Sequence, residues 1–439
     1  MTNVVYLHGH PTPVAHFLRI GVSGHRRLEQ LLAANQLPYS RFVGEAGVFL
    51  RQKDLVAGLR QAGHELVLDT NIAELSVEGR YRGAAKGAPW ADPHGVLTEA
   101  HLTEAHVRIG RNEPDRIAQI ARFAVENGIN RVMAPGHYLA EATDSWFKTD
   151  LATCTRLRDA LDREGGRDIA IDYPLIVSSA ALIDVAQRRA FVASLADEPI
   201  ASLWLRVSGF GGHATAPALR KYISAMRDFH ELGVPIIADC VGGLSAQAIL
   251  AFGAASGIAH GVAEKERFDA SSWHKPPPPA EEKKRGGNAY SVLLPGIDRL
   301  LKPEQALALI DSAGGRRLLA CNDRRCCPRG FDDTMADPKG HYLRQRAWQC
   351  EAISVVPESR RAQDFLDRTL ADADRKARQV ARLKVPDAKL KEILEGNARR
   401  VDRVRVVLEN LQQTEAMSTR AEAFPAAIPL KSIQKRDGR

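Results

Sequence analysis

Long hydrophobic runs are missing from this chain of 439 residues. No apolar run approaches the ~20 residues that a membrane-spanning helix needs, and the N-terminus lacks the pattern of a signal peptide. Hydrophobic residues still make up 44% of the sequence, which is ample for a buried core. We therefore expect a soluble, cytoplasmic protein with no membrane partner.

Cysteine is also scarce, with six in the whole chain, and four of the six lie between Cys321 and Cys350. Crowded thiolates in a chain without a secretory signal favour a bound metal over disulfides. Zinc suits such a cluster, because tetrahedral sulfur ligands stabilise a loop that has little core of its own. The spacing matches no standard zinc finger, and either Cys326 or Cys327 could instead be an ordinary small apolar residue. The prediction is a structural zinc site on Cys321, Cys326, Cys327 and Cys350, with His341 as the alternative fourth ligand.

A glycine motif of the form Gly-x-Gly-x-x-Gly is absent from the first strand–helix turn, which argues against a Rossmann fold. Instead, short apolar strands alternate with amphipathic helices along most of the chain, a pattern typical of a parallel sheet. About eight such units fit a (β/α)8 TIM barrel. The predicted organisation is an N-terminal cap (1–40), the barrel (41–315) with a proline-rich loop (271–287), a cysteine-rich, zinc-binding helical appendage (316–415) and a basic tail (416–439).

Negative charge is outweighed by positive charge, which leaves a net charge of +8. A basic excess favours polyanionic partners through contacts with phosphate groups. Many soluble proteins are mildly basic for no specific reason, so charge alone makes nucleic acid a candidate partner and no more.

Polar side chains end several of the predicted strands: Asp69, His137, Asp172, Asp239 and His260. In a barrel of this kind the chemistry gathers at the carboxyl ends of the strands. A single Asp or His at such a position often only caps the next helix, but five on one rim are a stronger signal. A carboxylate pair there would supply the nucleophile and the general acid/base of a glycosyl transfer. We predict Asp69, Asp239 and Asp172 as catalytic residues, and His137 and His260 as substrate-binding residues.

Glycines follow two consecutive strands, at Gly211 and Gly212 and again at Gly242 and Gly243. Glycine lets the backbone approach a planar base or a phosphate, and it also makes tight turns. These four residues are predicted to bind substrate, with tight turns as the alternative.

The order of these parts resembles the tRNA-guanine transglycosylase superfamily, including its DNA-modifying 7-deazaguanine branch. Segment 208–212 is similar to the family's Gly-Gly-Leu segment that contacts the base. Segment 241–244, with Gly257 and Ile258 after it, is similar to two later strands of the family. Segment 341–344, with Cys350 and Glu351 beyond it, resembles the helix behind the family's zinc loop.

The resemblance implies a zinc-containing barrel that exchanges guanine for a 7-deazaguanine base in DNA or tRNA. Asp239 or Asp69 would be the nucleophile and the other the general acid/base, and duplex DNA would require extrusion of the base. The chain also departs from the family. Its Asp-Ser-Gly-Gly-Phe-Gln motif is replaced by the segment around Asp69 or that around Asp92, and His260 stands where the nucleophilic aspartate is expected. The sequence leaves open whether the polymer is DNA or RNA and whether the chain forms a homodimer.

Two other functions remain open at this point. One is a catalytically inactive barrel that binds nucleic acid, favoured by the loss of the family's aspartates at their matched positions. The other is an unrelated barrel enzyme acting on a small phosphorylated substrate. That enzyme would need a phosphate-binding loop, for which 286–287 and 314–315 are the available glycine pairs.

Overall fold

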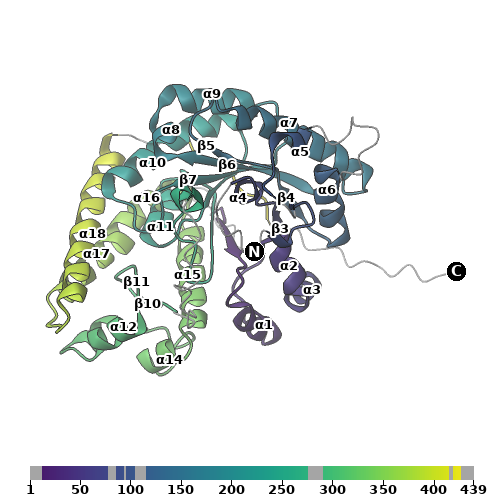
Figure 1. Cartoon of the computed structure of the whole chain (residues 1–439). Helices are drawn as coiled ribbons and strands as arrows, with labels where there is room; N and C mark the ends of the chain where they lie inside the picture. Colours follow the sequence, from purple (N-terminus) through teal and green to yellow (C-terminus); the bar gives the residue numbers. More distant parts are fainter. Residues whose placement is uncertain are drawn as a thin grey trace, which may run out of the picture.

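Eight parallel strands close into a barrel in the computed structural model, which describes residues 12–77, 86–92, 95–103, 115–274, 290–414 and 419–426. The first strand pairs with the second and the last, and the fourth pairs with β6, so the sheet has no open edge. The strands are β1 (Ala15–Arg19), β2 (Arg41–Glu45), β3 (Glu65–Asp69), β4 (Arg131–Met133), β6 (Ala170–Ser178), β7 (Ser202–Ser208), β8 (Ile236–Asp239) and β9 (Gly257–His260). The predicted (β/α)8 TIM barrel is confirmed (Figure 1).

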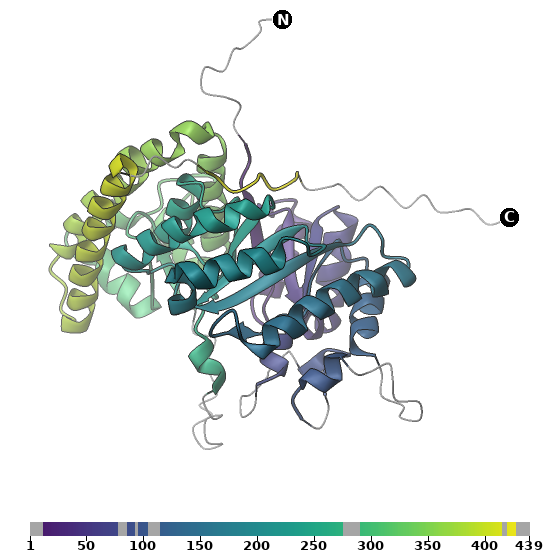
Figure 2. The same ribbon diagram turned by 90° about the horizontal axis from the view of Figure 1, so that it is seen from above.

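Helices follow the strands and cover the outside of the barrel (Figure 2). Several begin at a side chain that accepts an amide hydrogen bond, as Asp144, Asp184 and Thr215 do, which explains where these helices start. The main helices are α1 (His25–Ala33), α3 (Lys53–Gln61), α6 (Arg116–Glu126), α7 (Ser145–Arg163), α9 (Val185–Leu195), α10 (Ala216–Phe229) and α11 (Gly243–Ala251). Shorter helices are α2 (Ala46–Arg51), α4 (Ile72–Leu75), α5 (Glu99–Thr103) and α8 (Ser179–Ile183).

The N-terminal segment is part of the barrel, so the expected cap over 1–40 is wrong. β1 lies between β2 and β9, with Phe17 opposite Arg41 on one side and Ala259 on the other. The strand is only five residues long and carries a histidine and an arginine, so it has no continuous apolar run. The segment is a strand because it pairs with β9, which lies more than 240 residues further along the chain.

The fourth strand of the barrel is interrupted. β4 pairs with the first part of β6, and β5 (Tyr138–Leu139) pairs with its last part. Pro174 lies opposite the interruption and has no N–H to donate toward it. Gly136 fits there because a Cβ would come within 2.8 Å of Pro174. The interruption leaves His137 between the two half-strands at the carboxyl end of the barrel.

The interior of the barrel is apolar in the middle and ionic at both ends. The central side chains belong to one buried cluster, made of Ala15, Phe17, Val43, Val67, Met133, Trp204, Ile237, Ala259 and Phe424. At the amino ends, Arg41 pairs with Glu65 at 2.9 Å and Arg131 with Asp172. The carboxyl ends hold a second ionic group, which forms the mouth of the barrel.

Residues 419–426 close the amino end of the barrel, which corrects the expectation of a free basic tail from residue 416. Phe424 is buried and packs edge-on against Phe17, with ring centroids 5.2 Å apart. The guanidinium groups of Arg41 and Arg131 each lie 4.9 Å from the Phe424 ring. Arg41 also donates to the Pro425 carbonyl at 2.5 Å. Figure 2 shows this segment beside the first strand. The rest of the predicted tail (427–439) lies outside the described residues.

The appendage follows β9 and packs on one side of the barrel (Figure 1). It begins with the hairpin β10 (Val292–Leu294) and β11 (Arg299–Leu301), which shares a core with the helices after it, so the expected boundary at 315 is too late. Its helices are α12 (Pro303–Ile310), α13 (Gly315–Leu319), α14 (Phe331–Ala336), α15 (Pro338–Ser354), α16 (Glu358–Asp364), α17 (Ala371–Ala381) and α18 (Ala388–Thr414), with a π-helical turn, η5 (Phe365–Leu370), between α16 and α17.

The start of the predicted proline-rich loop is helical instead. Residues Ala270–His274 form the 3₁₀-helix η3, and Trp273 within it is buried. The remainder of that loop (275–289) lies outside the described residues. No helix in the described part of the chain is long and apolar enough to cross a membrane.

Replacing Phe424 with alanine should destabilise the barrel. The change removes a buried ring and leaves two guanidinium groups without their aromatic partner, so we expect the free energy of unfolding to fall by about 3 kcal/mol. Urea unfolding measures this loss. Phe424→Leu keeps most of the buried volume and should recover part of it, whereas an unchanged midpoint for Phe424→Ala would contradict the closing role of this segment.

Candidate functional site

Four charged side chains form a closed ring at the carboxyl ends of β1, β3, β7 and β8. We call Arg19, Asp69, Arg206 and Asp239 the mouth ring. Arg19 donates to both oxygens of Asp239, at 2.7 and 2.6 Å, and to Asp69 at 2.8 Å. Arg206 donates to Asp239 at 2.8 Å and to Asp69 at 3.0 Å. Each arginine therefore contacts both aspartates, and all four side chains are buried.

The two aspartates of the mouth ring are ionised at neutral pH. Burial alone would raise the pKa of Asp69, but Arg206 and Arg19 together lower it well below its usual value. The pKa of Asp239 is lowered by the same two arginines against the same effect of burial. Ionised carboxylates can act as nucleophiles or bases, but they have no proton to give as a general acid.

Asp172 lies at the opposite end of the barrel, so its prediction as a catalytic residue at the mouth is wrong. It is the third residue of β6, which continues past Pro174 to Ser178. Arg131 donates to it at 2.9 Å and Ser202 at 2.6 Å, and its side chain is fully buried. The sequence places Asp172 at the end of a strand, but β6 runs six residues beyond it, with Pro174 opposite the interruption between β4 and β5.

The predicted glycines mainly allow two loops to pack closely. A Cβ at Gly242 would come within 2.3 Å of the Glu266 side chain, and one at Gly243, where φ is +62°, within 2.2 Å of Asp298. At Gly211 a Cβ would lie 2.4 Å from the Glu266 carbonyl oxygen, and at Gly212 3.1 Å from the Gly242 carbonyl oxygen. All four are buried, so the alternative of tight packing accounts for them in this structure.

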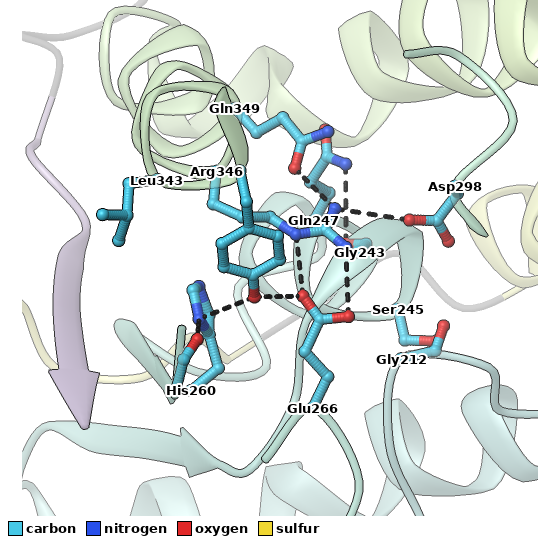
Figure 3. A network of polar contacts seen from close by, with 12 residues as sticks. Gly212, Gly243, Ser245, Gln247, His260, Glu266, Asp298, Leu343, Arg346 and Gln349 are labelled. Atoms are coloured by element: carbon cyan, nitrogen blue, oxygen red, sulfur yellow. Dashed lines mark hydrogen bonds and ion pairs between the residues drawn. The ribbon is translucent and has the colours of Figure 1, made fainter. Parts of the chain in front are cut away.

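Glu266 is the centre of a polar network that joins the barrel to α15 (Figure 3). Arg346 donates to its two oxygens at 2.7 and 3.0 Å, and Tyr342 donates at 2.6 Å. Arg346 also lies 3.4 Å from Asp298 in the appendage. The buried guanidinium is thus neutralised from both sides, which binds the appendage to the barrel.

His260 belongs to this network and not to the mouth. Its neighbour Ala259 faces the barrel interior, so His260 points outward, where its ring lies 3.1 Å from the Tyr342 hydroxyl. Its other nitrogen lies 2.8 Å from His16 on β1. Burial lowers the pKa of His260, so the ring is neutral. The prediction that it binds substrate at the rim is therefore wrong.

His137 lies at the rim of the mouth, but it contacts no member of the mouth ring through a hydrogen bond that the described residues contain. Its ring bonds Asp150 on one side and Ser76 on the other. Of the five predicted strand-end residues, only Asp69 and Asp239 share partners among the described residues: both contact Arg19 and Arg206. His137 forms a separate group on the same rim.

Arg19 and Arg206 complete the mouth ring, and neither was predicted. Each is the inward residue two positions after a large aromatic side chain, Phe17 or Trp204, that also faces inward. The alternation of inward and outward side chains along a strand is the sequence signal that could have identified both arginines.

The appendage contains a group of side chains that can hold a metal ion. The ligand atoms of Cys321, Cys326, Cys327 and His341 all lie within 4.8 Å of one another. The sulfurs of Cys326 and Cys327 are 3.7 Å apart, which agrees with the ~3.8 Å between two sulfurs bound tetrahedrally to zinc at ~2.3 Å. His341 Nε2 donates to the Leu293 carbonyl at 3.0 Å, which leaves Nδ1 facing both sulfurs at 3.4 Å.

Cys350 is not part of this group, and the fourth candidate ligand is the alternative, His341. Both residues lie on α15, but Cys350 is nine residues further on, about 13 Å along the helix axis. It is buried in the core between α15 and the barrel, and burial raises its pKa to about 12. Three of the four predicted metal ligands are therefore brought together, and the fourth is not.

No family model matches this sequence, and no curated protein matches it either. Solved structures of other barrels are similar to it in outline only. A family 26 β-mannanase from Bacteroides ovatus is 12% identical with a TM-score of 0.36, and the match covers 61% of this chain and 85% of that one. A type I 3-dehydroquinate dehydratase from Clostridium difficile is 8% identical with a TM-score of 0.35, covering 62% and 92%. The α subunit of tryptophan synthase from Campylobacter jejuni is 11% identical with a TM-score of 0.32, covering 58% and 88%. Likenesses this distant assign neither a substrate nor a reaction to the chain.

The metal site predicts a difference between two cysteine variants. The purified protein should contain about one metal ion per chain, and Cys327→Ala should lose it and melt at a lower temperature, because metal binding contributes folding free energy. Cys350→Ala should keep the ion. Elemental analysis by mass spectrometry, with thermal melting, checks both. Full metal content in Cys327→Ala, or its loss in Cys350→Ala alone, would return Cys350 to the ligand set.

The mouth ring predicts a loss of stability in acid. The folded-state pKa of Asp69 lies below the ~3.9 of an unfolded chain, so its stabilisation is complete above that value and is lost as the pH falls toward the folded-state pKa. Asp69→Asn should lower the free energy of unfolding at pH 7 by roughly 3 kcal/mol and make its decline below pH ~4 shallower. Urea unfolding over a series of pH values measures this, with exposed Asp197→Asn as the control. Identical curves for all three proteins would rule out the ionised ring.

Proposed function

We propose that the chain is an enzyme that exchanges guanine for a 7-deazaguanine base in nucleic acid, at the carboxyl-end mouth of the barrel. The observation that carries the proposal is the pair of ionised carboxylates, Asp69 and Asp239, where barrel enzymes have their reactive groups. The resemblance to the transglycosylase superfamily supports it, because a barrel followed by a metal-binding helical appendage is the order of parts that the family implies.

The charge state of the pair suits the first half of such an exchange. A nucleophile that attacks the sugar carbon as the base leaves must be ionised, and either Asp239 or Asp69 meets that requirement. The second carboxylate then acts as a base, taking a proton from the incoming base. The proton for the departing guanine comes from another donor, because Arg19 and Arg206 keep both aspartates deprotonated.

Entry of a base requires a change at the mouth. Asp239 is 1% exposed and Asp69 5% exposed. Phe268 packs against one member of the mouth ring: the Arg206 guanidinium lies 5.7 Å from the centroid of the Phe268 side chain. A planar base that displaced Phe268 would meet the same guanidinium face and could stack on it. The same movement of Phe268 would then admit the base and expose the two carboxylates.

The loop around the metal site supports a polyanionic partner. Five arginines on it or on the preceding helix are exposed, namely Arg316 and Arg317 on α13 and Arg324, Arg325 and Arg329 on the loop. Such residues contact phosphate groups and release counterions, which makes binding sensitive to salt. We propose zinc as the ion, because three thiolates and one imidazole are a set that zinc prefers. The ion would hold this arginine-rich loop in one conformation.

One alternative also has an observation in its favour. The mouth ring neutralises itself without a ligand, as a barrel that only binds nucleic acid would allow. The other alternative, a barrel enzyme that acts on a small phosphorylated substrate, has less support. Gly315 packs against the Leu309 carbonyl, which a Cβ would approach to 1.8 Å, and the pair 286–287 lies outside the described residues.

Asp239→Asn should abolish the incorporation of radiolabelled guanine or deazaguanine base into DNA or tRNA, because an amide can serve neither as the nucleophile nor as the base. Asp172→Asn is the matched control: it removes an equally buried, arginine-paired carboxylate from the far end of the barrel and should lose stability but keep exchange. Melting of both variants gives the folded fraction.

Exchange that survives in folded Asp239→Asn would remove this residue from the chemistry. An intact protein that binds either polymer in a salt-sensitive way but exchanges nothing would favour the non-catalytic barrel. Mass spectrometry of nucleosides from cells with and without the gene identifies the polymer and the base.

A further inference from the structure

A second polar group lies on the rim of the mouth, made of Ser76, His137 and Asp150. Ser76 ends the short helix α4 that follows β3, and His137 lies in the interruption between β4 and β5. Asp150 is on α7, in the second turn of the helix. Three separate segments at the carboxyl end of the barrel therefore meet at one point.

The three side chains form a chain of hydrogen bonds from Ser76 through His137 to Asp150. His137 Nδ1 lies 2.6 Å from Asp150 Oδ1, and the His137 backbone N–H donates to Asp150 Oδ2 at 2.8 Å. A carboxylate accepts the Nδ1 proton, so Nε2 has a free lone pair. The Ser76 hydroxyl lies 2.9 Å from Nε2 and donates to it. This is the order of contacts that activates a serine as a nucleophile.

The imidazole is fixed in place. The Trp146 ring stacks on it, with centroids 3.8 Å apart and planes 15° from parallel. Asp150 is fully buried and His137 is 3% exposed, whereas Ser76 is only half-buried. The end of the group that faces outward is therefore the hydroxyl, which is the end that would meet a substrate.

Two other buried histidines in the described part of the chain have a backbone carbonyl on one ring nitrogen. His341 Nε2 bonds the Leu293 carbonyl, and His260 Nδ1 bonds the Gly261 carbonyl. His341 also faces two cysteine sulfurs, and His260 also contacts Tyr342 and His16, so neither ring lies between a carboxylate and a hydroxyl. His137 instead has a carboxylate on one nitrogen and a partly open hydroxyl on the other.

An apolar cluster includes the residues next to Ser76 and His137 in the chain. Ala73, Ile176, Ala270 and Trp273 form a buried cluster at the mouth, with Val77, Tyr138 and Phe268 packed against it. Val77 follows Ser76 in the chain, and Tyr138 follows His137. A substrate whose reacting carbon sits at Ser76 would place an apolar group against this cluster.

We propose that Ser76 is a nucleophile, activated by His137, that hydrolyses small esters with an apolar acyl group. The Ser76 oxygen adds to the ester carbonyl as its proton moves to His137 Nε2. The tetrahedral adduct then expels the alkoxide, which takes that proton and leaves as the alcohol. Water adds to the acyl-serine by the same route, releasing the carboxylic acid and restoring Ser76. Asp150 is the positioning residue. The step uses no member of the mouth ring, so it is independent of base exchange.

A fluorophosphonate, which phosphonylates activated serines, tests this on the full-length protein. Intact-mass analysis should find one adduct per chain, and peptide mapping should locate it at Ser76. His137→Gln should slow labelling at least ~100-fold, the usual contribution of a general base. Ser179→Ala is the control, since Ser179 is an exposed serine of the same rim that donates to the Ser208 carbonyl. It should label at the native rate.

A native, folded protein that is unlabelled at Ser76 would overturn the proposal, and the three residues would then only connect α4, β4 and α7. Labelling that His137→Gln leaves unchanged would overturn it as well. The assay contains no nucleic acid and the exchange assay contains no ester. Failure of one proposal is therefore distinguishable from failure of the other.

Discussion

Charge neutralisation inside the barrel is the constraint on which the rest of this structure depends. Four ionised groups in the mouth ring are nearly excluded from water, and such groups are tolerated only when every one of them is paired. Arg19, Asp69, Arg206 and Asp239 come from four different strands, so the pairing is complete only when the barrel is closed in this register. The same four contacts that close the mouth also keep its carboxylates ionised, which links stability to the chemistry that we propose.

The appendage is attached through the first half of α15. His341 reaches the three-cysteine group and the Leu293 carbonyl together. The next residue, Tyr342, and Arg346 one turn further on bind Glu266 of the barrel. A single helix thus carries both the metal ligand and the barrel contact. The arginine-rich metal loop is held in a definite place relative to the mouth, as a polymer substrate would require.

Two kinds of reactive group lie on one rim, and they differ in what they can do. The mouth ring has ionised carboxylates with no proton to donate. The group around His137 has a hydroxyl in contact with an imidazole, 2.9 Å apart. The two groups share no hydrogen bond among the described residues: His137, in the interruption of the fourth strand, bonds Ser76 and Asp150. Phe268, which contacts Arg206, packs against the same apolar cluster as Tyr138, the residue after His137.

The sequence by itself determined the alternation of strands and helices, the residues that end the strands, and the cysteine cluster, because each of these is a local pattern. It therefore predicted the barrel, the position of Asp69 and Asp239 at the carboxyl ends of their strands, and three of the four residues of the candidate metal group. The tertiary structure alone decided the rest. β1 became a strand through pairing with β2 and with the distant β9, and Asp172 went to the far end because β6 continues past Pro174. His341 takes the fourth place in the candidate metal group because a straight helix carries Cys350 away from the loop. The arginines that complete the mouth ring acquire their role only when distant strands meet, since the pairing of buried charges is a property of the closed barrel and not of any one segment.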